Sequence, residues 1–99
     1  MAKFEINIYD HNDKVVKTHQ RNKCPVELFL KFQQYSEKVT GEQITNDGDF
    51  FAGLKELFLE LFPDMTENEY MNNTDVAEVI VLYSTVVRKA TQFTSAKNA

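Results

Sequence analysis

The chain has 99 residues, of which 42% are hydrophobic and 26% charged, and its formal net charge is −4. These values predict one small folded domain over residues 1–99 and exclude a disordered or fibrous class. The acidic balance argues against a nucleic-acid binder, because neutralising phosphates requires clustered Lys and Arg. No apolar run approaches the roughly 20 residues that span a bilayer, and the N-terminus carries no apolar signal segment, so we expect a cytosolic protein that binds no membrane.

Residues 1–20 have the pattern of a β-hairpin. Phe4, Ile6 and Ile8 alternate with more polar residues at the period of a half-buried strand. The Asp/Asn-rich segment 10–13 predicts a turn, and 14–19 can return as the second strand. A lone hairpin is marginal in water, so this one must pack on helices or pair with another chain.

Two helices are expected next, over 25–40 and 49–62. Pro25 suits the first turn of a helix and Gly41 supplies a stop signal. Asp47 or Asp49 can cap the second helix, which Pro63 terminates.

The remaining chain predicts a short helix over 66–71 and a long one over 74–91. Thr66 and Glu69 match a capping box, and Asn73 or Thr74 can cap the last helix. The β-branched run 79–83 favours a strand, but the helical spacing of the apolar residues outweighs it. We expect a frayed tail over 92–99. The fold class is therefore α+β, mostly α: an N-terminal β-hairpin, three main helices and one short helical turn.

The helix predicted over 49–62 carries two apolar rows, and two rows require two partners. One row holds Phe50, Leu54, Leu57 and Leu61; the other holds Phe51, Phe58 and Phe62. One partner is the domain's own core, and the other is a second copy or a client protein. Gly53 indicates either the close approach of another backbone or a tolerated glycine on a stable helix.

The sequence predicts neither catalysis nor a bound cofactor or metal. His11 and His19 are expected to be solvated, and Cys24 to be a small buried residue; its alternative is a reactive thiolate at a helix start, paired with His19 in an enzyme. One cysteine and two histidines do not make a zinc site, and three scattered glycines do not make a phosphate loop. The acidic residues Glu56, Glu60, Asp64, Glu67 and Glu69 form a solvated face or a docking surface for a basic partner.

The order of these parts resembles the small tail assembly chaperones of long-tailed bacteriophages, especially phages of Gram-positive hosts. The residues that carry the resemblance are Phe50-Phe-x-Gly-Leu-x-x-Leu-Phe-x-x-Leu-Phe62, Thr66-x-x-Glu-Tyr70, Asn73-Thr-Asp75 and the aliphatic helix after them. The resemblance covers nearly the whole chain and includes no catalytic signature.

This resemblance implies a non-enzymatic chaperone of the host-cell cytoplasm that binds the long, largely helical phage tape measure protein and keeps it soluble. The residues expected to touch this client or a second copy are Phe51, Leu54, Phe58, Phe62 and Tyr83. The alternative is a self-assembling structural or adaptor component of a phage tail or connector, in which the hairpin edge and the opposite charges of the chain's ends build a homo-oligomer.

Overall fold

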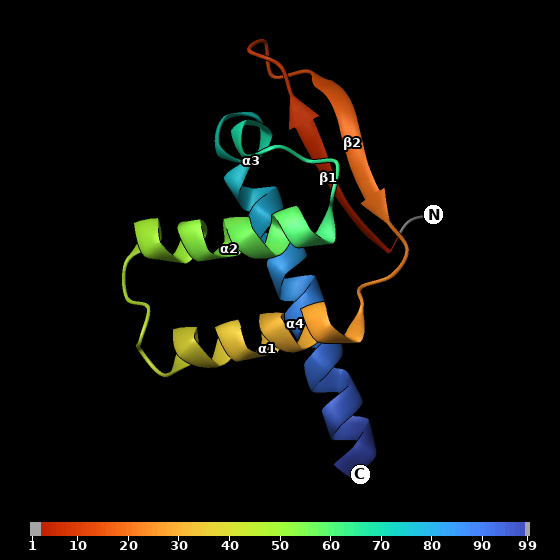
Figure 1. The fold of residues 1–99 in the computed structure, drawn as a ribbon, viewed down its shortest axis with the longest axis vertical. Helices are drawn as coiled ribbons and strands as arrows, with labels where there is room; N and C mark the ends of the chain where they lie inside the picture. Colours follow the sequence, from red (N-terminus) through yellow and green to blue (C-terminus); the bar gives the residue numbers. More distant parts are fainter. Residues whose placement is uncertain (1–2, 99) are drawn as a thin grey trace.

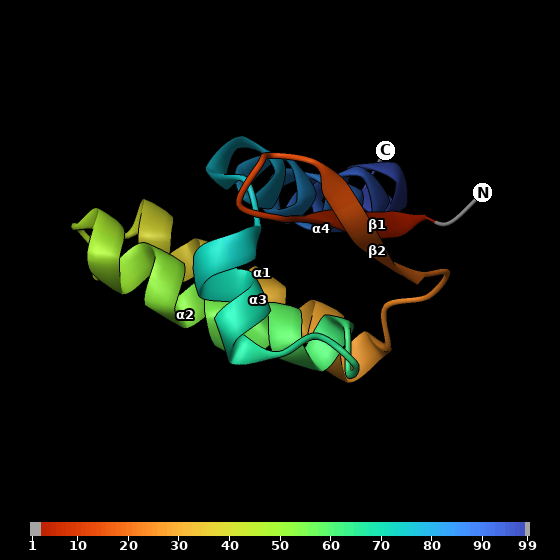
Figure 2. The same cartoon turned by 90° about the horizontal axis from the view of Figure 1, so that it is seen from above.

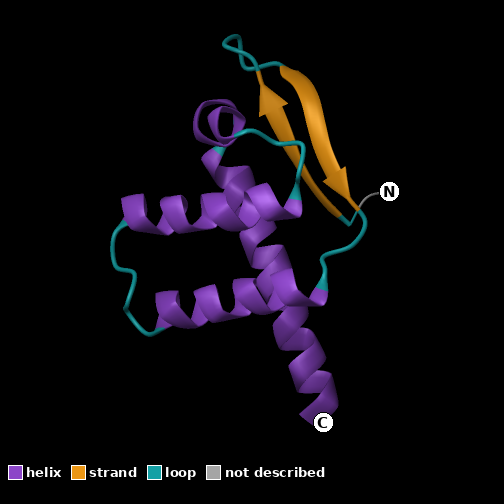
Figure 3. Ribbon diagram, viewed as in Figure 1, coloured by secondary structure: helices purple, strands orange, loops and turns teal. Residues whose placement is uncertain are grey.

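The computed structural model describes residues 3–98, with side chains through residue 88. An N-terminal hairpin is followed by four helices, which confirms the α+β, mostly α class (Figure 3). Figures 1 and 2 show two layers: α1 (Val26–Thr40) and α2 (Asp47–Leu61) form one, while α4 (Val76–Asn98) and the hairpin form the other. The short α3 (Glu67–Asn73) packs against α2 and the first strand.

The hairpin joins β1 (Phe4–Tyr9) to β2 (Val15–Arg21) in antiparallel register, with Ile6 opposite His19. The predicted turn is confirmed. The carboxylate of Asp10 accepts the N–H groups of Asn12 at 2.8 Å and Lys14 at 3.0 Å, and Asp13 adopts a positive φ of 63°. Phe4, Ile6 and Ile8 are all buried, as their period-2 spacing predicted.

The start of α2 differs from the prediction. Asn46 is the N-cap, and its side-chain oxygen accepts the N–H of Asp49 at 2.8 Å, so the helix begins at Asp47 rather than at residue 49. Neither aspartate caps the helix. The last helical residue is Leu61, with Phe62 as C-cap before Pro63.

The capping box of α3 is confirmed: Thr66 Oγ1 accepts the N–H of Glu69 at 3.1 Å, and Glu69 Oε1 accepts that of Thr66 at 3.0 Å. Neither Asn73 nor Thr74 caps the last helix, which begins at Val76 rather than at 74. The Asn73 amide donates to the carbonyl of Tyr9 and the Thr74 hydroxyl to that of Tyr70, whereas Asp75 Oδ1 accepts the N–H of Ala77 at 3.5 Å. The β-branched run is helical, as predicted.

The frayed tail is a wrong prediction for residues 92–98. Helix α4 continues to Asn98, because residues 91–98 contain neither glycine nor proline to stop it. Residue 99 lies outside the described residues.

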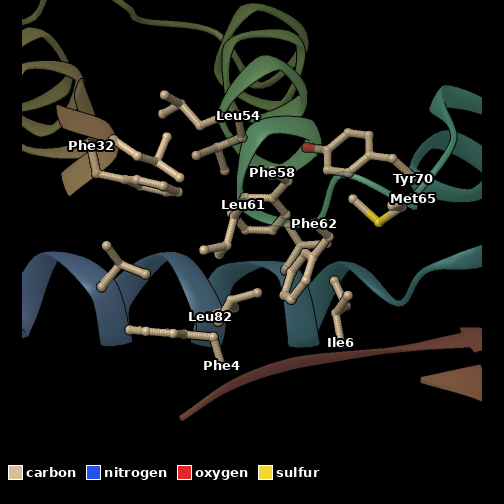
Figure 4. Packing of buried hydrophobic residues seen from close by; sticks show 14 of the residues in the cluster. Phe4, Ile6, Phe32, Leu54, Phe58, Leu61, Phe62, Met65, Tyr70 and Leu82 are labelled. Carbon is tan, nitrogen blue, oxygen red and sulfur yellow. The ribbon is translucent and has the colours of Figure 1, made fainter. Parts of the chain in front are cut away.

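One buried apolar cluster lies between the two layers, and it takes residues from β1 and from all four helices (Figure 4). A polar junction adds to it where β2 meets α3. Glu69 accepts hydrogen bonds from Lys17 Nζ at 2.9 Å and from the Thr66 N–H, and its Oε1 lies 3.0 Å from His19 Nε2. The Lys17 ammonium and the Thr66 N–H lower the pKa of Glu69 to about 2.

Candidate partner-binding surface

Three of the five residues predicted to touch a partner are part of the core instead. Leu54 and Phe58 are 0% exposed and Phe62 is 2% exposed, so none of them is accessible to a partner in this fold. The reason is that α2 has neighbours on both sides. The Phe58 ring lies 6.1 Å from Phe32 of α1 and 5.8 Å from Tyr70 of α3, measured between ring centroids (Figure 4).

The other two residues, Phe51 and Tyr83, are half-buried members of an aromatic cluster. Phe50 lies at its centre, with ring centroids 5.1 Å from Phe51 and 5.4 Å from Tyr83, both edge to face. Tyr35 of α1 completes the cluster, 6.1 Å from Phe50 and 6.3 Å from Tyr83. Because its members come from three helices, this cluster fixes Phe51 and Tyr83 at the junction of α2 and α4.

Gly53 makes room for Tyr35. A Cβ atom at position 53 would lie 2.5 Å from the Tyr35 ring and hydroxyl, so the close approach is by a side chain and not by another backbone. The Tyr35 hydroxyl donates to the carbonyl of Phe50 at 2.5 Å, and burial raises the pKa of Tyr35. Because residue 53 is a glycine, the Tyr35 ring can lie against α2 and bond to Phe50 in the first turn of that helix.

Exposed apolar side chains that the sequence analysis missed continue from this cluster along α3 and α4. Met71, Val76 and Ile80 are 58%, 56% and 44% exposed. Phe51, Met71 and Val76 share a shallow pocket of about 160 Å³, and Val76, Ile80 and Tyr83 follow one another at i, i+4 and i+7 on one helix face. We call Phe51, Met71, Val76, Ile80 and Tyr83 the α3–α4 patch.

A signal for this patch was present in the sequence. The apolar positions of α4 include 76, 79, 80, 82, 83, 86 and 87, which cover a wider arc than one packed layer can hide. In the structure Val79, Leu82 and Val86 face the core, while Val76 and Ile80 remain at the surface. The prediction that the surplus apolar surface lies on α2 is wrong; it lies on α4.

Acidic residues adjoin the patch. Asp75 directly precedes Val76, and Asp47 and Asp49 occupy the first turn of α2 before Phe50. Residues 40–79 carry ten acidic groups and one basic group, and that basic group, Lys55, is paired with Glu67 at 2.9 Å. The surroundings of the patch therefore favour a partner whose apolar face is flanked by basic residues.

Three of the five acidic residues considered as a docking surface form ion pairs within the domain. Glu60 pairs with Lys31 at 2.8 Å, Glu67 with Lys55, and Glu69 with Lys17 and His19. A carboxylate already paired with a lysine of the same domain attracts a basic residue of another protein less strongly. This stretch is therefore a weaker docking candidate than the α3–α4 patch.

The three residues considered as catalytic candidates, His11, His19 and Cys24, lie in surroundings that do not favour catalysis. His19 is 8% exposed and lies against Glu69, so the expectation of a solvated His19 is wrong, whereas His11 is exposed as expected. Cys24 is half-buried, and burial raises the pKa of its thiol, which disfavours the thiolate that a nucleophile requires.

Within residues 3–98, no group of three His, Cys, Asp or Glu side chains could hold a metal ion. No helix in the same range is both long and apolar enough to cross a membrane. No protein-family model, curated protein or solved structure matches this chain.

Proposed function

We propose that this protein is a non-enzymatic phage tail assembly chaperone that binds the tape measure protein and keeps it soluble in the host cytoplasm. The proposal rests on the sequence resemblance together with one observation, the exposed apolar α3–α4 patch beside a fixed aromatic cluster. A surface of this kind suits a protein that works by binding rather than by catalysis.

The geometry of the patch fits the helix-in-groove mode of recognition. Val76, Ile80 and Tyr83 lie on one face of α4, and Phe51 and Met71 line a shallow pocket together with Val76. An amphipathic client helix could lay its apolar face along these side chains, with each well-buried anchor contributing about 1–3 kcal/mol. Because Phe51 and Tyr83 are already held by Phe50, little ordering is needed on binding.

The test is co-expression with the tape measure protein of the same genome, followed by affinity pull-down and light scattering. Ile80→Glu places a charge in the patch, and we expect it to weaken client binding about tenfold or more. Val81→Glu is the matched control, because Val81 is 64% exposed on the same helix but points away from the patch. Equal binding by both variants would exclude the patch as the client site, and no soluble complex with the unaltered protein would exclude the chaperone.

The second candidate function, a self-assembling tail or connector component, is favoured by a different observation. Val15 and Val16 on the outer strand of the hairpin are 51% and 62% exposed, and an exposed edge strand of this kind can pair with a neighbouring subunit. Particle size separates the two functions. A ring component forms a large discrete oligomer whose size does not change on dilution, whereas a chaperone without its client stays small.

A further inference from the structure

The two edges of the hairpin differ. The outer edge of β1 lies beside α4, where Glu78 Oε1 accepts the N–H of Asn7 at 3.4 Å and Glu78 also accepts the Tyr9 hydroxyl. Among residues 3–98, the sheet contains only β1 and β2, so the outer edge of β2 has no strand against it. Free strand edges are templates for another strand, and in this hairpin only β2 offers one.

The register identifies the groups on that edge. The Asn7 N–H points away from β2, toward Glu78, so Asn7 and Thr18 form a non-hydrogen-bonded pair. Their side chains meet, with Thr18 Oγ1 donating to Asn7 Oδ1 at 2.8 Å, as this closer type of pair allows. The backbone N–H and C=O of Thr18 therefore point outward, and those of Gln20 do the same by the two-residue period.

The charges of β2 are turned toward its own domain. Lys17 and His19 contact Glu69, and Arg21 Nη1 donates to the carbonyls of Glu60 and Leu61 at 3.2 and 3.0 Å. The opposite face of the strand carries the uncharged residues Thr18 and Gln20, and Val16 follows them at a β-bulge, where the pairing with β1 passes from Lys17 to Val15. On this face a second strand thus meets no charged side chain of β2.

We infer that two copies of this chain pair through the outer edges of their β2 strands, antiparallel, with the twofold axis at Thr18. This register places Thr18 opposite Thr18 and Lys17 opposite His19 of the second copy, and it brings Val16, at the bulge, against Gln20. A shift of the axis to His19 would place Lys17 opposite Arg21, so charge selects the register. The pairing adds about four to six hydrogen bonds and joins two hairpins into a four-stranded sheet.

A second copy fits this edge better than an unrelated peptide, because the same uncharged face, with Thr18 and Gln20, then lies on both strands and the charges of each strand are turned toward its own domain. The contact is isologous, so it closes at a dimer and builds neither a ring nor a filament by itself. Its small area makes the dimer weak and dependent on concentration. It shares no residue with the α3–α4 patch and is independent of the chaperone proposal, but it uses the strand whose exposed Val15 and Val16 favour the second candidate function.

Cysteine cross-linking tests the register. In a Cys24→Ala background, Thr18→Cys places two thiols across the axis, where a Cα separation of about 5.5 Å permits a disulfide. Gln20→Cys is the control, since two copies of residue 20 would lie about 13 Å apart. With oxidised glutathione as oxidant, we expect a covalent dimer from Thr18→Cys, none from Gln20→Cys alone, and one from a mixture of Val16→Cys and Gln20→Cys. Equal cross-linking at positions 18 and 20, or none at 18, would overturn the inference.

Sedimentation velocity provides a second readout without oxidation. The mass of the unaltered protein should rise with concentration, while Thr18→Lys and Thr18→Glu, checked for folding by circular dichroism, should each stay monomeric. An equimolar mixture of the two should recover the dimer, because opposite charges then face each other. A dimer that persists in Thr18→Lys, or no dimer of the unaltered protein at any concentration, contradicts the pairing.

Discussion

Helices α2 and α4 both carry more apolar residues than one face can hold, and the structure treats them differently. In α2 both rows are largely buried: Leu54, Phe58 and Leu61 are 0% exposed, and Phe50 and Phe51 in its first turns are half-buried. In α4 only the face toward α1 and β1 is covered, and Val76 and Ile80 remain about half exposed. The difference shows that exposed apolar surface depends on which faces of a helix its neighbours cover, not on how aromatic its sequence is.

The position of each helix explains this outcome. Helix α2 lies between α1 and α3, and Phe58 contacts an aromatic ring from each. Helix α4 lies in the other layer beside the hairpin (Figure 2), and its residues Val76 and Ile80 are 56% and 44% exposed. The neighbours of α2 bury most of both of its apolar rows, whereas the neighbours of α4 leave the face of Val76 and Ile80 at the surface.

The largest expected effect compares two phenylalanines one heptad apart on α2. Phe58→Ala should cost about 3–5 kcal/mol, because it empties a fully buried site. Phe51→Ala should cost about 1–2 kcal/mol, because Phe51 is half-buried and its site stays open to water. Urea unfolding of both variants measures the difference. Similar losses would mean that Phe51 is as fully buried as Phe58, so that α2 contributes no accessible side chain to the α3–α4 patch.

A smaller effect is expected at Gly53, where α2 meets Tyr35. Gly53→Ala should destabilise by about 1–2 kcal/mol, since the new Cβ displaces the Tyr35 ring and breaks its hydrogen bond to Phe50, which exceeds the gain in helix propensity. In a Tyr35→Ala background the same change should stabilise, by up to about 1 kcal/mol. This double-mutant cycle is read by thermal unfolding. The absence of a sign change would show that Tyr35 is not what keeps residue 53 a glycine.

The smallest expected effect on stability comes from Glu69, which joins β2 to α3 and lies outside the apolar rows of α2 and α4. The folded-state pKa of Glu69, about 2, lies below its ordinary 4.5, so its contribution to stability is present above about pH 4.5 and is lost as the pH falls toward 2. Glu69→Gln should therefore cost about 1 kcal/mol at pH 7 and almost nothing at pH 2. Unfolding is measured at both pH values. A cost independent of pH would mean that the carboxylate charge does not hold β2 to α3.

Most of the fold followed from local patterns. The alternation of Phe4, Ile6 and Ile8, the Asp10 turn and the Thr66–Glu69 capping box are each read from neighbouring residues, and each is confirmed. The errors lie at helix ends. Asn46 rather than an aspartate caps α2, because the residue with extended backbone accepts the bond, and the sequence offers several equivalent candidates there.

The candidate surface was predicted less well for a physical reason. The spacing of Leu54, Phe58 and Phe62 identifies an apolar face, but a face bound to a client and a face bound to the core have the same spacing. His19 was misplaced for the same reason: the carboxylate that accompanies it, Glu69, is fifty residues away in sequence. Only long-range packing distinguishes these cases.

The sequence by itself determined the elements, their order and the acidic middle of the chain, because hydrogen bonds within a helix, turn geometry and charge are local properties. The tertiary structure decided which apolar rows meet. It buried the aromatic row of α2 between α1 and α3, left Met71, Val76 and Ile80 at the surface, and turned the outer edge of β2 to solvent. Burial depends on which elements become neighbours, and that choice is made by the whole chain at once.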